Sequence, residues 1–385
     1  MSLFTAYMIT GFVVVCILSV VVCLARWSLD SPEPIQTVCN VAQHPVSQDP
    51  IRVIIEEKLT DTEWVTDLAF EKDDPRDWAS YQGQQHIKEF VQLQLDVVPI
   101  DEGLKLMFVA EKGSGKTTLF RIIAKKLLEK RGGRYIEITP AMIKTKDRLD
   151  SLMGQLSKWD ILSIDEVHQL NRNNADTLLP AIEDNIFPFD TGMTALPPAI
   201  TWLGATTDVG LLPEAFQDRF QILTLQHLSL ENLVSILKDL HFPIKDDAAR
   251  SIAARSLGSP RELKRIFKTS RDVCVRAGSS LISTKHTHEA FRLLDLDENG
   301  LYLQDRKVLE ALYKNPKFYA PRADGTRLKR YAHSERAIRA LTGLDESLYR
   351  DQIEPKLLRQ GFLTIGTGGR ELTDKAFGSY RVKWE

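Results

Sequence analysis

Residues 104–118 read Leu-Lys-Leu-Met-Phe-Val-Ala-Glu-Lys-Gly-Ser-Gly-Lys-Thr-Thr, an apolar run followed at once by a glycine-rich turn. Glycine at Gly113 and Gly115 lets backbone N–H groups turn toward phosphate oxygens, because no Cβ stands in the way. Lys116 then supplies a positive charge for the β- and γ-phosphates, and Thr117 offers its hydroxyl to Mg²⁺. The stretch therefore predicts a phosphate loop between a strand and a helix, with ATP and Mg²⁺ as its ligands.

The residues expected to hold the phosphates are those of the turn and of the helix start. A helix that begins near Thr117 directs the positive end of its dipole at the anion. Ala110 stands where the usual pattern has its first glycine, a position that mainly serves the turn. By itself the stretch is also compatible with an ordinary glycine-rich turn. The predicted phosphate-binding residues are Gly113, Ser114, Gly115, Lys116, Thr117 and Thr118.

A second strand pattern, further along the chain, ends in two acids. Residues 160–164 lead straight into Asp165 and Glu166. At the carboxyl end of a buried parallel strand, Asp165 can reach the Mg²⁺ shell, and Glu166 can polarise a water for attack on the γ-phosphate. A solvated acid pair that caps a following helix is the alternative. Beside a phosphate loop, we expect Lys116, Asp165 and Glu166 to be catalytic, and Thr117 and Asp165 to be the metal ligands.

Composition limits the remaining possibilities. The chain has 385 residues, 43% hydrophobic and 26% charged, which favours two or three globular units. Its four cysteines show no paired spacing, so neither a zinc site nor a disulfide framework is indicated. The net charge of −2 is unevenly spread, because residues 301–385 carry 17 Lys+Arg and 11 Asp+Glu, a net of +6 against −8 for residues 1–300. That basic end is a candidate nucleic-acid surface.

The first part of the chain is strongly apolar. Residues 4–25 contain no charged side chain, and as a helix they would be about 33 Å long, enough to cross a bilayer core. A cleavable signal peptide is the alternative, yet no basic residue precedes the run and no clean small-x-small site follows it. Arg26 favours a cytoplasmic position for the rest of the chain, where ATP is found. We therefore expect a single-pass membrane protein with a cytoplasmic ATPase body.

Six motifs in a fixed order make the sequence comparable with a known family. They are Pro75-Arg76-Asp77-Trp78-Ala79-Ser80-Tyr81-Gln82-Gly83-Gln84, the phosphate loop, Asp165-Glu166-Val167-His168-Gln169-Leu170, Leu203-Gly204-Ala205-Thr206-Thr207, Asp218-Arg219-Phe220 and Gly258-Ser259-Pro260-Arg261. Their order resembles the RuvB family of AAA+ ATPases, the bacterial motors that drive Holliday-junction branch migration. The resemblance spans roughly residues 70–380 and leaves the apolar start of the chain unmatched.

This resemblance implies the fold and the domain order. The expected fold is an α/β AAA+ P-loop NTPase, a parallel sheet flanked by helices, with a helical lid and a C-terminal winged helix. A single N-terminal transmembrane helix is added to it by the apolar run. The expected domains are a transmembrane anchor at 1–26, a linker at 27–50, a large ATPase domain at 51–228, a helical lid at 229–298 and a winged-helix DNA-binding domain at 299–385.

The resemblance also implies roles for residues outside the phosphate loop. Tyr81, Gln82 and Gly83 are similar to the segment that packs around adenine. Thr207 is similar to the sensor residue that responds to the γ-phosphate from the end of a neighbouring strand. Arg261 is similar to the nucleotide-binding arginine that the lid carries, although its motif also fits a plain helix start with proline in the first turn.

Arg219 resembles an arginine finger, which reaches the ATP of an adjacent subunit and stabilises charge in the transition state. Such a finger acts only in a ring or another head-to-tail oligomer, so the resemblance implies a homo-oligomer, a hexamer. A surface arginine without a catalytic role is the alternative.

The C-terminal region has the pattern of a winged helix. Helices are expected at 306–313, 335–341 and 347–360, with a kink at Pro355 in the third. Residues 361–373 predict a β-hairpin with a glycine-rich tip, the wing, in which Arg370 is the expected DNA-binding residue. Ile365 stands where the resembling family has another wing arginine. A winged helix that binds protein is the alternative.

Residues 185–196 depart from the family pattern. The segment is shorter than the β-hairpin that RuvB proteins carry at this point, which docks the junction-recognising partner RuvA. A RuvA-like partner is therefore doubtful.

Three functions are compatible with these features. The favoured one is an ATP-dependent DNA translocase of the branch-migration type, a hexameric ring on duplex or junction DNA that is tethered to a membrane. The second is a membrane-anchored AAA+ ATPase that remodels a protein partner, with the winged helix as adaptor. The third is a nucleotide-binding scaffold that hydrolyses poorly, which the full set of Lys116, Asp165, Glu166 and Arg219 disfavours.

Overall fold

The computed structural model describes residues 64–66, 68, 70, 74–318 and 329–384. The predicted membrane helix at 1–26 and the linker at 27–50 lie outside the described residues. Among the helices of the described part, none is long and apolar enough to cross a membrane.

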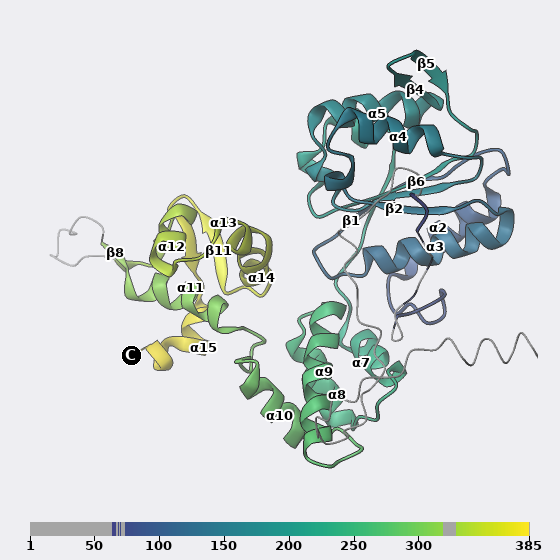
Figure 1. The fold of residues 1–385 in the computed structure, drawn as a ribbon. Helices are drawn as coiled ribbons and strands as arrows, with labels where there is room; N and C mark the ends of the chain where they lie inside the picture. Colours follow the sequence, from purple (N-terminus) through teal and green to yellow (C-terminus); the bar gives the residue numbers. More distant parts are fainter. Residues whose placement is uncertain (1–63, 67, 69, 71–73, 319–328, 385) are drawn as a thin grey trace, which may run out of the picture. The chain divides into compact units, whose positions relative to one another are not determined.

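A five-stranded parallel sheet forms the centre of the ATPase region (Figure 1). Its strand order is β2-β3-β6-β1-β7, so β6 lies between the strands that lead into the two predicted site motifs. Every residue of β3 and of β6 is buried, which is the pattern of strands covered on both faces. The strands are β1 Lys105–Val109, β2 Tyr135–Ile138, β3 Ile161–Ile164, β6 Thr201–Thr206 and β7 Gln221–Thr224.

Helices cover the two faces of this sheet (Figure 1). Side chains of β1 alternate between them: Leu106 and Phe108 pack with the apolar residues of α2 and α3, whereas Met107 packs with those of α4 and α5. The sheet therefore separates two hydrophobic cores, and the strand ends that carry the site motifs lie at its edge. The helices are α2 Gln85–Val97, α3 Lys116–Arg131, α4 Lys146–Gln155 and α5 Arg172–Asp184.

Residues 185–196, where the shortened hairpin was predicted, form two antiparallel strands between α5 and β6. The strands are β4 Ile186–Phe189 and β5 Gly192–Ala195. Phe187 is buried, Met193 is 63% exposed, and Lys146 Nζ lies 2.6 Å from Asp190 Oδ1 near the turn. The short helices of this domain are η1 Pro140–Ile143, η2 Val167–Gln169, η3 Val209–Leu211 and α6 Glu214–Gln217.

Four helices follow β7 and form the lid. The side chains of Ser229 and Ser259 cap the first and third of these helices by accepting the N–H groups of Asn232 and Glu262. Pro260 occupies the first turn of α9, where its missing N–H leaves no bond unmade. The lid helices are α7 Leu230–Asp239, α8 Asp246–Arg255, α9 Pro260–Arg276 and α10 Thr284–Leu293.

The C-terminal region has helices and a wing, as predicted. The wing strands β11 and β12 pair antiparallel, and β10 joins them at the other edge of β12. The third predicted helix is interrupted directly before Pro355 by a π-helical turn, which agrees with the expected kink. The elements are α11 Leu303–Lys314, β10 Ala332–His333, α12 Glu335–Thr342, α13 Glu346–Leu348, the π-turn η4 Tyr349–Ile353, α14 Glu354–Arg359, β11 Leu363–Gly366 and β12 Gly369–Leu372.

Four elements of this region had no counterpart in the sequence analysis. They are the strand β10, the short antiparallel pair β8 Lys317–Phe318 and β9 Lys329–Arg330, and the terminal helix α15 Asp374–Trp384. Ala376 and Tyr380 of α15 are buried in the core of the winged helix. The helix therefore completes this core.

Candidate nucleotide site

The ends of β1, β6 and β3 meet at one edge of the sheet. The phosphate loop follows β1, and Asp165 and Glu166 follow β3. Ala110 continues the pairing of β1, because its N–H donates to the carbonyl oxygen of Thr206 at 3.1 Å. The alanine at the first position of the motif thus acts as the last residue of a strand, and the turn itself begins after it. Parallel strands end at the same edge, which brings these distant motifs together.

Two positions of the loop have no room for a side chain. Gly113 and Gly115 have φ angles of +82° and +98°, in the left-handed region that favours glycine. A Cβ on Gly113 would lie 2.7 Å from the Cβ of Arg261, and one on Gly115 would lie 3.2 Å from the Oη of Tyr81. Glycine is therefore required both by the backbone turn and by close neighbours from the lid and from the segment before α2.

Lys116 is the first residue of α3, and its side chain lies inside the loop. The residue is 6% exposed, and Nζ donates to the carbonyl oxygens of Ala110 at 2.7 Å and Glu111 at 3.2 Å. Burial lowers the pKa of Lys116, and the nearby Asp165 and Glu166 partly oppose this effect. No side chain caps the N-terminus of α3. A desolvated ammonium beside uncapped helix N–H groups is an arrangement suited to a polyphosphate.

Thr117 and Asp165 face one another beside the loop. The hydroxyl of Thr117 donates to Asp165 Oδ2 at 3.3 Å, and Asp165 Oδ1 accepts the N–H of Glu166 at 2.9 Å. Hydroxyl and carboxylate oxygens are ligands that Mg²⁺ prefers, and Mg²⁺ takes few protein ligands when it also binds phosphates. The donor set therefore fits Mg²⁺, with Thr117 and Asp165 as the residues that would hold it.

Glu166 adopts a backbone conformation that is unusual for its residue type. Its φ and ψ angles are 51° and 47°, a left-handed conformation that costs roughly 1–2 kcal/mol outside glycine. Its Oε2 atom is buried and accepts no hydrogen bond within the part of the chain that the structure describes. His168 Nδ1 lies 3.5 Å from this oxygen. Strain and an unpaired acceptor in one residue are features of functional sites.

The end of β6 lies between the loop and the acid pair. Thr206, its last residue, is buried, and its hydroxyl donates to the carbonyl oxygen of Asp208 at 3.0 Å. Thr207, the predicted sensor, is the next residue and is half-buried at the same edge. Its contact with a γ-phosphate stays a prediction.

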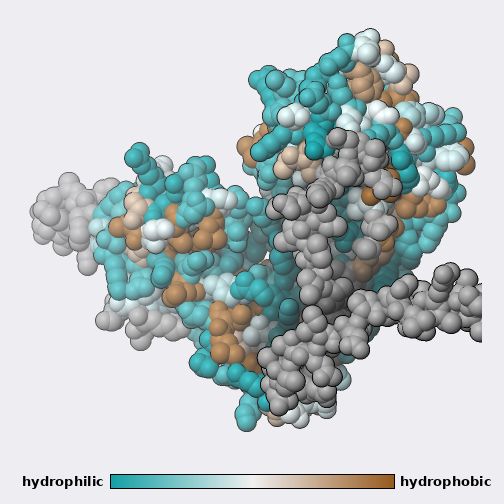
Figure 2. Space-filling view, in the orientation of Figure 1, coloured by the Kyte–Doolittle hydropathy of each residue, from teal (hydrophilic) through white to brown (hydrophobic). Residues whose placement is uncertain are grey.

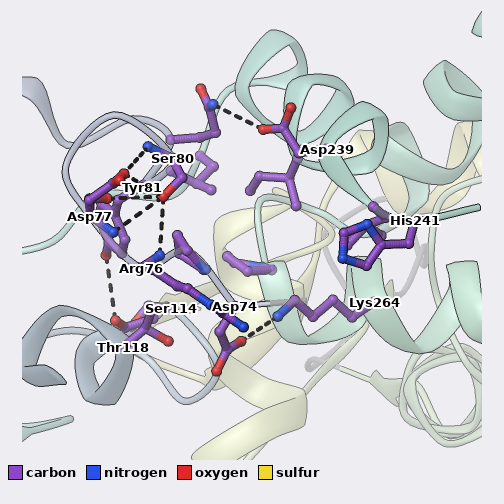
Figure 3. Close-up of a pocket in the computed structure, with 17 residues that line it drawn as sticks. Asp74, Arg76, Asp77, Ser80, Tyr81, Ser114, Thr118, Asp239, His241 and Lys264 are labelled. Atoms are coloured by element: carbon purple, nitrogen blue, oxygen red, sulfur yellow. Dashed lines mark hydrogen bonds and ion pairs between the residues drawn. The ribbon is translucent and has the colours of Figure 1, made fainter. Parts of the chain in front are cut away.

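A cavity of about 470 Å³ opens beside the phosphate loop (Figure 3). Tyr81 and Gln82, predicted to surround adenine, line it together with Ser114, Gly115 and Thr118 of the loop and helix. The lid supplies the opposite wall, which includes Leu228, Ile236, Asp239, Leu240, His241, Pro260 and Lys264. A cavity of this size next to a phosphate loop suits a nucleoside.

Gly83 does not line this cavity. It has a φ angle of +72°, and a Cβ added to it would lie 2.5 Å from Leu228 Cδ2. Gly83 thus packs closely against the start of the lid, and its adenine-binding role stays a prediction.

Two polar contacts tie the lid to the segment before α2. Lys264 Nζ lies 2.6 Å from Asp74 Oδ1, and Asp74 is the less exposed partner, with 12% of its side chain accessible. Gln82 Nε2 donates to Asp239 Oδ2 at 3.3 Å. Both pairs lie at the cavity (Figure 3), so the lid closes one side of it.

Arg261, the predicted lid arginine, lies against the phosphate loop. Its N–H donates to the carbonyl oxygen of Gly113 at 3.3 Å. It lines a second, smaller cavity of about 160 Å³ together with Glu111 and Lys112 of the loop. The structure thus brings Arg261 to the loop, next to Lys116 rather than to the nucleoside cavity.

Glu111 of the phosphate loop has two basic neighbours that the sequence analysis missed. His227 Nε2 lies 3.3 Å from its Oε1, and Arg359 Nη1 donates to its Oε2. Burial alone would raise the pKa of Glu111, but the hydrogen bonds and charges of His227 and Arg359 hold the pKa at about 2. Glu111 is therefore ionised throughout the physiological range and is bonded to residues far along the chain.

Arg219 lies outside the cavity of its own chain. It follows α6, and its Nη2 lies 2.5 Å from Glu183 Oε2, an ion pair in which 26% of the arginine side chain is exposed. The residues that line the nucleoside cavity do not include it. The structure does not bring it to the other predicted catalytic residues within one chain.

Arg370 of the wing is engaged by two glutamates. Its guanidinium donates to both carboxylate oxygens of Glu354 and lies 3.6 Å from Glu335 Oε2. The hydrogen bond with Glu354 raises the pKa of Arg370. Ile365, its partner across the hairpin, is 58% exposed. A DNA contact by Arg370 stays a prediction, and it would require this pairing to open.

Two comparisons of sequence identify the relatives of the chain. A family model for the Holliday junction DNA helicase RuvB P-loop domain matches residues 74–226, and a model for the RuvB AAA lid domain matches residues 228–297. The Holliday junction branch migration complex subunit RuvB of Fervidobacterium nodosum is 32% identical over 319 residues, covering 79% of this chain and 87% of that protein. The corresponding subunit of Kosmotoga olearia is 30% identical over 320 residues, covering 79% and 88%.

Solved structures agree with this result. The RuvB Holliday junction branch migration motor of Thermotoga maritima is similar with a TM-score of 0.68 and 29% identity, covering 81% of this chain and 99% of that one. A mutant of that motor reaches a TM-score of 0.69 at 28% identity.

The buried charge of Lys116 predicts opposite effects on stability and on nucleotide binding. In Lys116→Met, we expect the melting temperature without nucleotide to stay at or above that of the wild type, because a desolvated ammonium is removed. ADP at 100 times its Kd should stabilise the wild type by about 2.7 kcal/mol and the variant hardly at all. Thermal unfolding with and without ADP measures both effects.

Lys112→Met is the matched control. Lys112 lies in the same loop, but 35% of its side chain is exposed and it pairs with Asp351. This variant should keep the stabilisation by ADP. Equal stabilisation of Lys116→Met and wild type would remove Lys116 from the phosphate site.

Proposed function

Because this chain belongs to the RuvB family of Holliday junction helicases, we propose that it is an ATP-driven motor that moves junction or duplex DNA as a membrane-tethered hexameric ring. The family shows that the chain is an ATPase of the DNA-helicase type, related to motors of Holliday-junction branch migration. The observation that carries it is the meeting of Lys116, Thr117 and Asp165 at the N-terminus of α3, beside a nucleoside-sized cavity.

The residues of the nucleotide site have separate roles in ATP hydrolysis. The cavity lined by Tyr81 and Gln82 takes the nucleoside, and the N-terminus of α3 with Lys116 takes the β- and γ-phosphates. Thr117 and Asp165 would hold Mg²⁺, which would supply charge neutralisation at the phosphates. Glu166 orients the attacking water and accepts its proton.

A shared site between subunits is supported by the position of Arg219. It lies outside its own cavity, as expected of an arginine that acts on the nucleotide of a neighbour. About half of the Glu183 side chain is exposed, so the ion pair between Arg219 and Glu183 is weak. Arg219 can therefore exchange Glu183 for a phosphate at a modest cost in free energy. A closed head-to-tail ring is the assembly in which every such site is completed.

Action on DNA is supported by the family, by the winged-helix topology and by the net charge of +6 on residues 301–385. Within the wing, Arg370 remains the proposed phosphate contact. The hairpin β4–β5 exposes Met193, yet its shortness leaves a RuvA-like partner doubtful.

A second candidate function is the remodelling of a protein partner at a membrane. It is favoured by the pairing of Arg370 with Glu354, which leaves the wing without a free guanidinium at the expected position. The winged helix would then serve as an adaptor.

The membrane tether rests on the sequence alone. Residues 4–25 carry no charge and are long enough for one span, and Arg26 on their flank favours a cytoplasmic ATPase body.

ATP turnover in the presence of DNA tests the proposed motor. The full-length protein in detergent should hydrolyse ATP faster with a four-way junction than without DNA, and the stimulation should fall steeply between about 50 mM and about 200 mM salt as phosphate contacts are lost. Steady-state turnover is measured with junction, linear duplex and no DNA, with Lys116→Met as the blank. Turnover that ignores DNA at both salt concentrations would favour the protein-remodelling function instead.

Mixing of inactive subunits tests the shared site. Lys116→Ala and Arg219→Ala should each lose most of the activity, with an arginine finger contributing on the order of 10³-fold. Mixed in varying ratio, they should recover some turnover, because a wild-type interface can form between them. Arg172→Ala, at a side chain that is 87% exposed, is the control and should stay active. Absence of recovery at every ratio would count against a site built from two subunits.

Membrane extraction tests the tether. The full-length chain should sediment with membranes and remain there after an alkaline wash, whereas a chain without residues 1–26 should be released and still hydrolyse ATP. Release of the full-length chain by high salt alone would contradict a membrane-spanning anchor.

A further inference from the structure

His168 lies between the predicted catalytic acid and the end of β6. It belongs to the short helix η2, which follows Glu166 directly, and 14% of its side chain is exposed. Its Nδ1 atom is 3.0 Å from Thr206 Oγ1 and 3.5 Å from Glu166 Oε2. One ring nitrogen therefore faces both the strand end and the carboxylate.

The hydrogen bonds of Thr206 favour one tautomer of this histidine. A hydroxyl has one hydrogen, and the Thr206 hydroxyl donates it to the carbonyl oxygen of Asp208 at 3.0 Å. The same hydroxyl accepts the N–H of Asp208 at 3.1 Å. With its hydrogen donated to the carbonyl oxygen of Asp208, the hydroxyl accepts from His168, and this is the arrangement in which Nδ1 of His168 carries a hydrogen and donates it.

Glu166 has an oxygen that needs such a donor. Its Oε2 is buried without a hydrogen bond among the described residues, although it lies 3.5 Å from the Nδ1–H group. A buried carboxylate oxygen is unfavourable without a hydrogen-bond donor. The attraction between Oε2 and the N–H dipole of His168 therefore favours the observed orientation of the Glu166 carboxylate.

We propose that His168 is a positioning residue for ATP hydrolysis, whose Nδ1–H group is held by Thr206 and fixes the direction of the Glu166 carboxylate. With Oε2 held toward His168, the other carboxylate oxygen is left for the attacking water. Thr206 adjoins Thr207, so a movement at the end of β6 shifts the imidazole and, through it, the acid. This inference rests on the ATPase activity proposed above.

A matched pair of substitutions isolates the nitrogen that matters. In His168→Asn, the amide nitrogen occupies roughly the place of Nδ1, whereas in His168→Gln it reaches roughly the place of Nε2. We expect His168→Asn to keep kcat near the wild-type value and His168→Gln to lose at least about 10-fold, because a small displacement of a catalytic group is costly. KM for ATP and the affinity for ADP should stay unchanged in both.

A double-mutant cycle with Thr206→Val tests the connection to β6. Thr206→Val removes the acceptor that holds the Nδ1–H group, so it should lower kcat on its own. Combined with His168→Gln, its effect should be much smaller than in the wild-type background, because both changes break the same link. Additive losses, or equal losses in the Asn and Gln variants, would overturn the proposal.

The tautomer is measured on the wild-type protein without reliance on turnover, and variants serve only to assign the signal. Selective ¹⁵N labelling of histidine, with His168 assigned by its missing signal in His168→Asn or in Thr206→Val by its shift, should show the Nδ1–H form. An Nε2–H form would overturn the proposal. ATP turnover of the wild type is measured first. An inactive wild-type protein in which His168 has the Nδ1–H form would contradict the proposed ATP-driven motor, but not the proposed arrangement of His168.

Discussion

Strand β6 is hydrogen-bonded between β1 and β3, and the arrangement of the site follows from its position. Its register pairs Val109 with Thr206 on one side and Ile164 with Gly204 on the other. A shift by one residue would move every side chain of β6 to the opposite face of the sheet and would break the pairing that places Thr206 beside both motifs. Met107 also packs closely against Gly204, because a Cβ added to Gly204 would lie 2.6 Å from Met107 Sδ. Dense packing thus fixes the phosphate loop, the acid pair and the strand end in one geometry.

The local motifs of this site could be predicted from the sequence, because each depends on a few neighbouring residues. The loop at Lys116 and the acids after β3 need only a strand, a turn and a helix start, and the wing needs only a glycine-rich hairpin. Long-range partners could not be predicted in this way. Asp74 forms an ion pair with Lys264, and Glu111 forms one with Arg359. The partners lie far apart in the sequence, so no short sequence pattern predicts that they come together. The pairing of Arg370 with Glu354 escaped prediction for the same reason. His168 belongs to the motif at residues 165–170, but its proposed role depends on its proximity to Thr206, which the sequence does not show.

The lid is connected to the phosphate loop by contact as well as by charge. The side chain of Arg261 fills the space that a Cβ on Gly113 would need, and Leu228 does the same at Gly83. Arg261 also donates its N–H to the loop carbonyl of Gly113. A rotation of the lid must therefore either break these contacts or displace the loop. Steric coupling of this kind acts over short distances and is not screened by salt, unlike the ion pair of Asp74 with Lys264.

Several arginines of the winged helix form ion pairs with acidic residues of the same domain. Arg330 pairs with Glu371, Arg339 with Glu335 and Glu346, and Arg370 with Glu354. Such pairing leaves the net charge of the region unchanged, so its attraction for a polyanion at the range of a Debye length, about 10 Å, is intact. Contact is different, because each phosphate must compete with a carboxylate that is already in place. Association and dissociation of a polyanion therefore depend on different features. The total charge sets the association rate, and the ease with which the internal ion pairs exchange for phosphate sets the residence time.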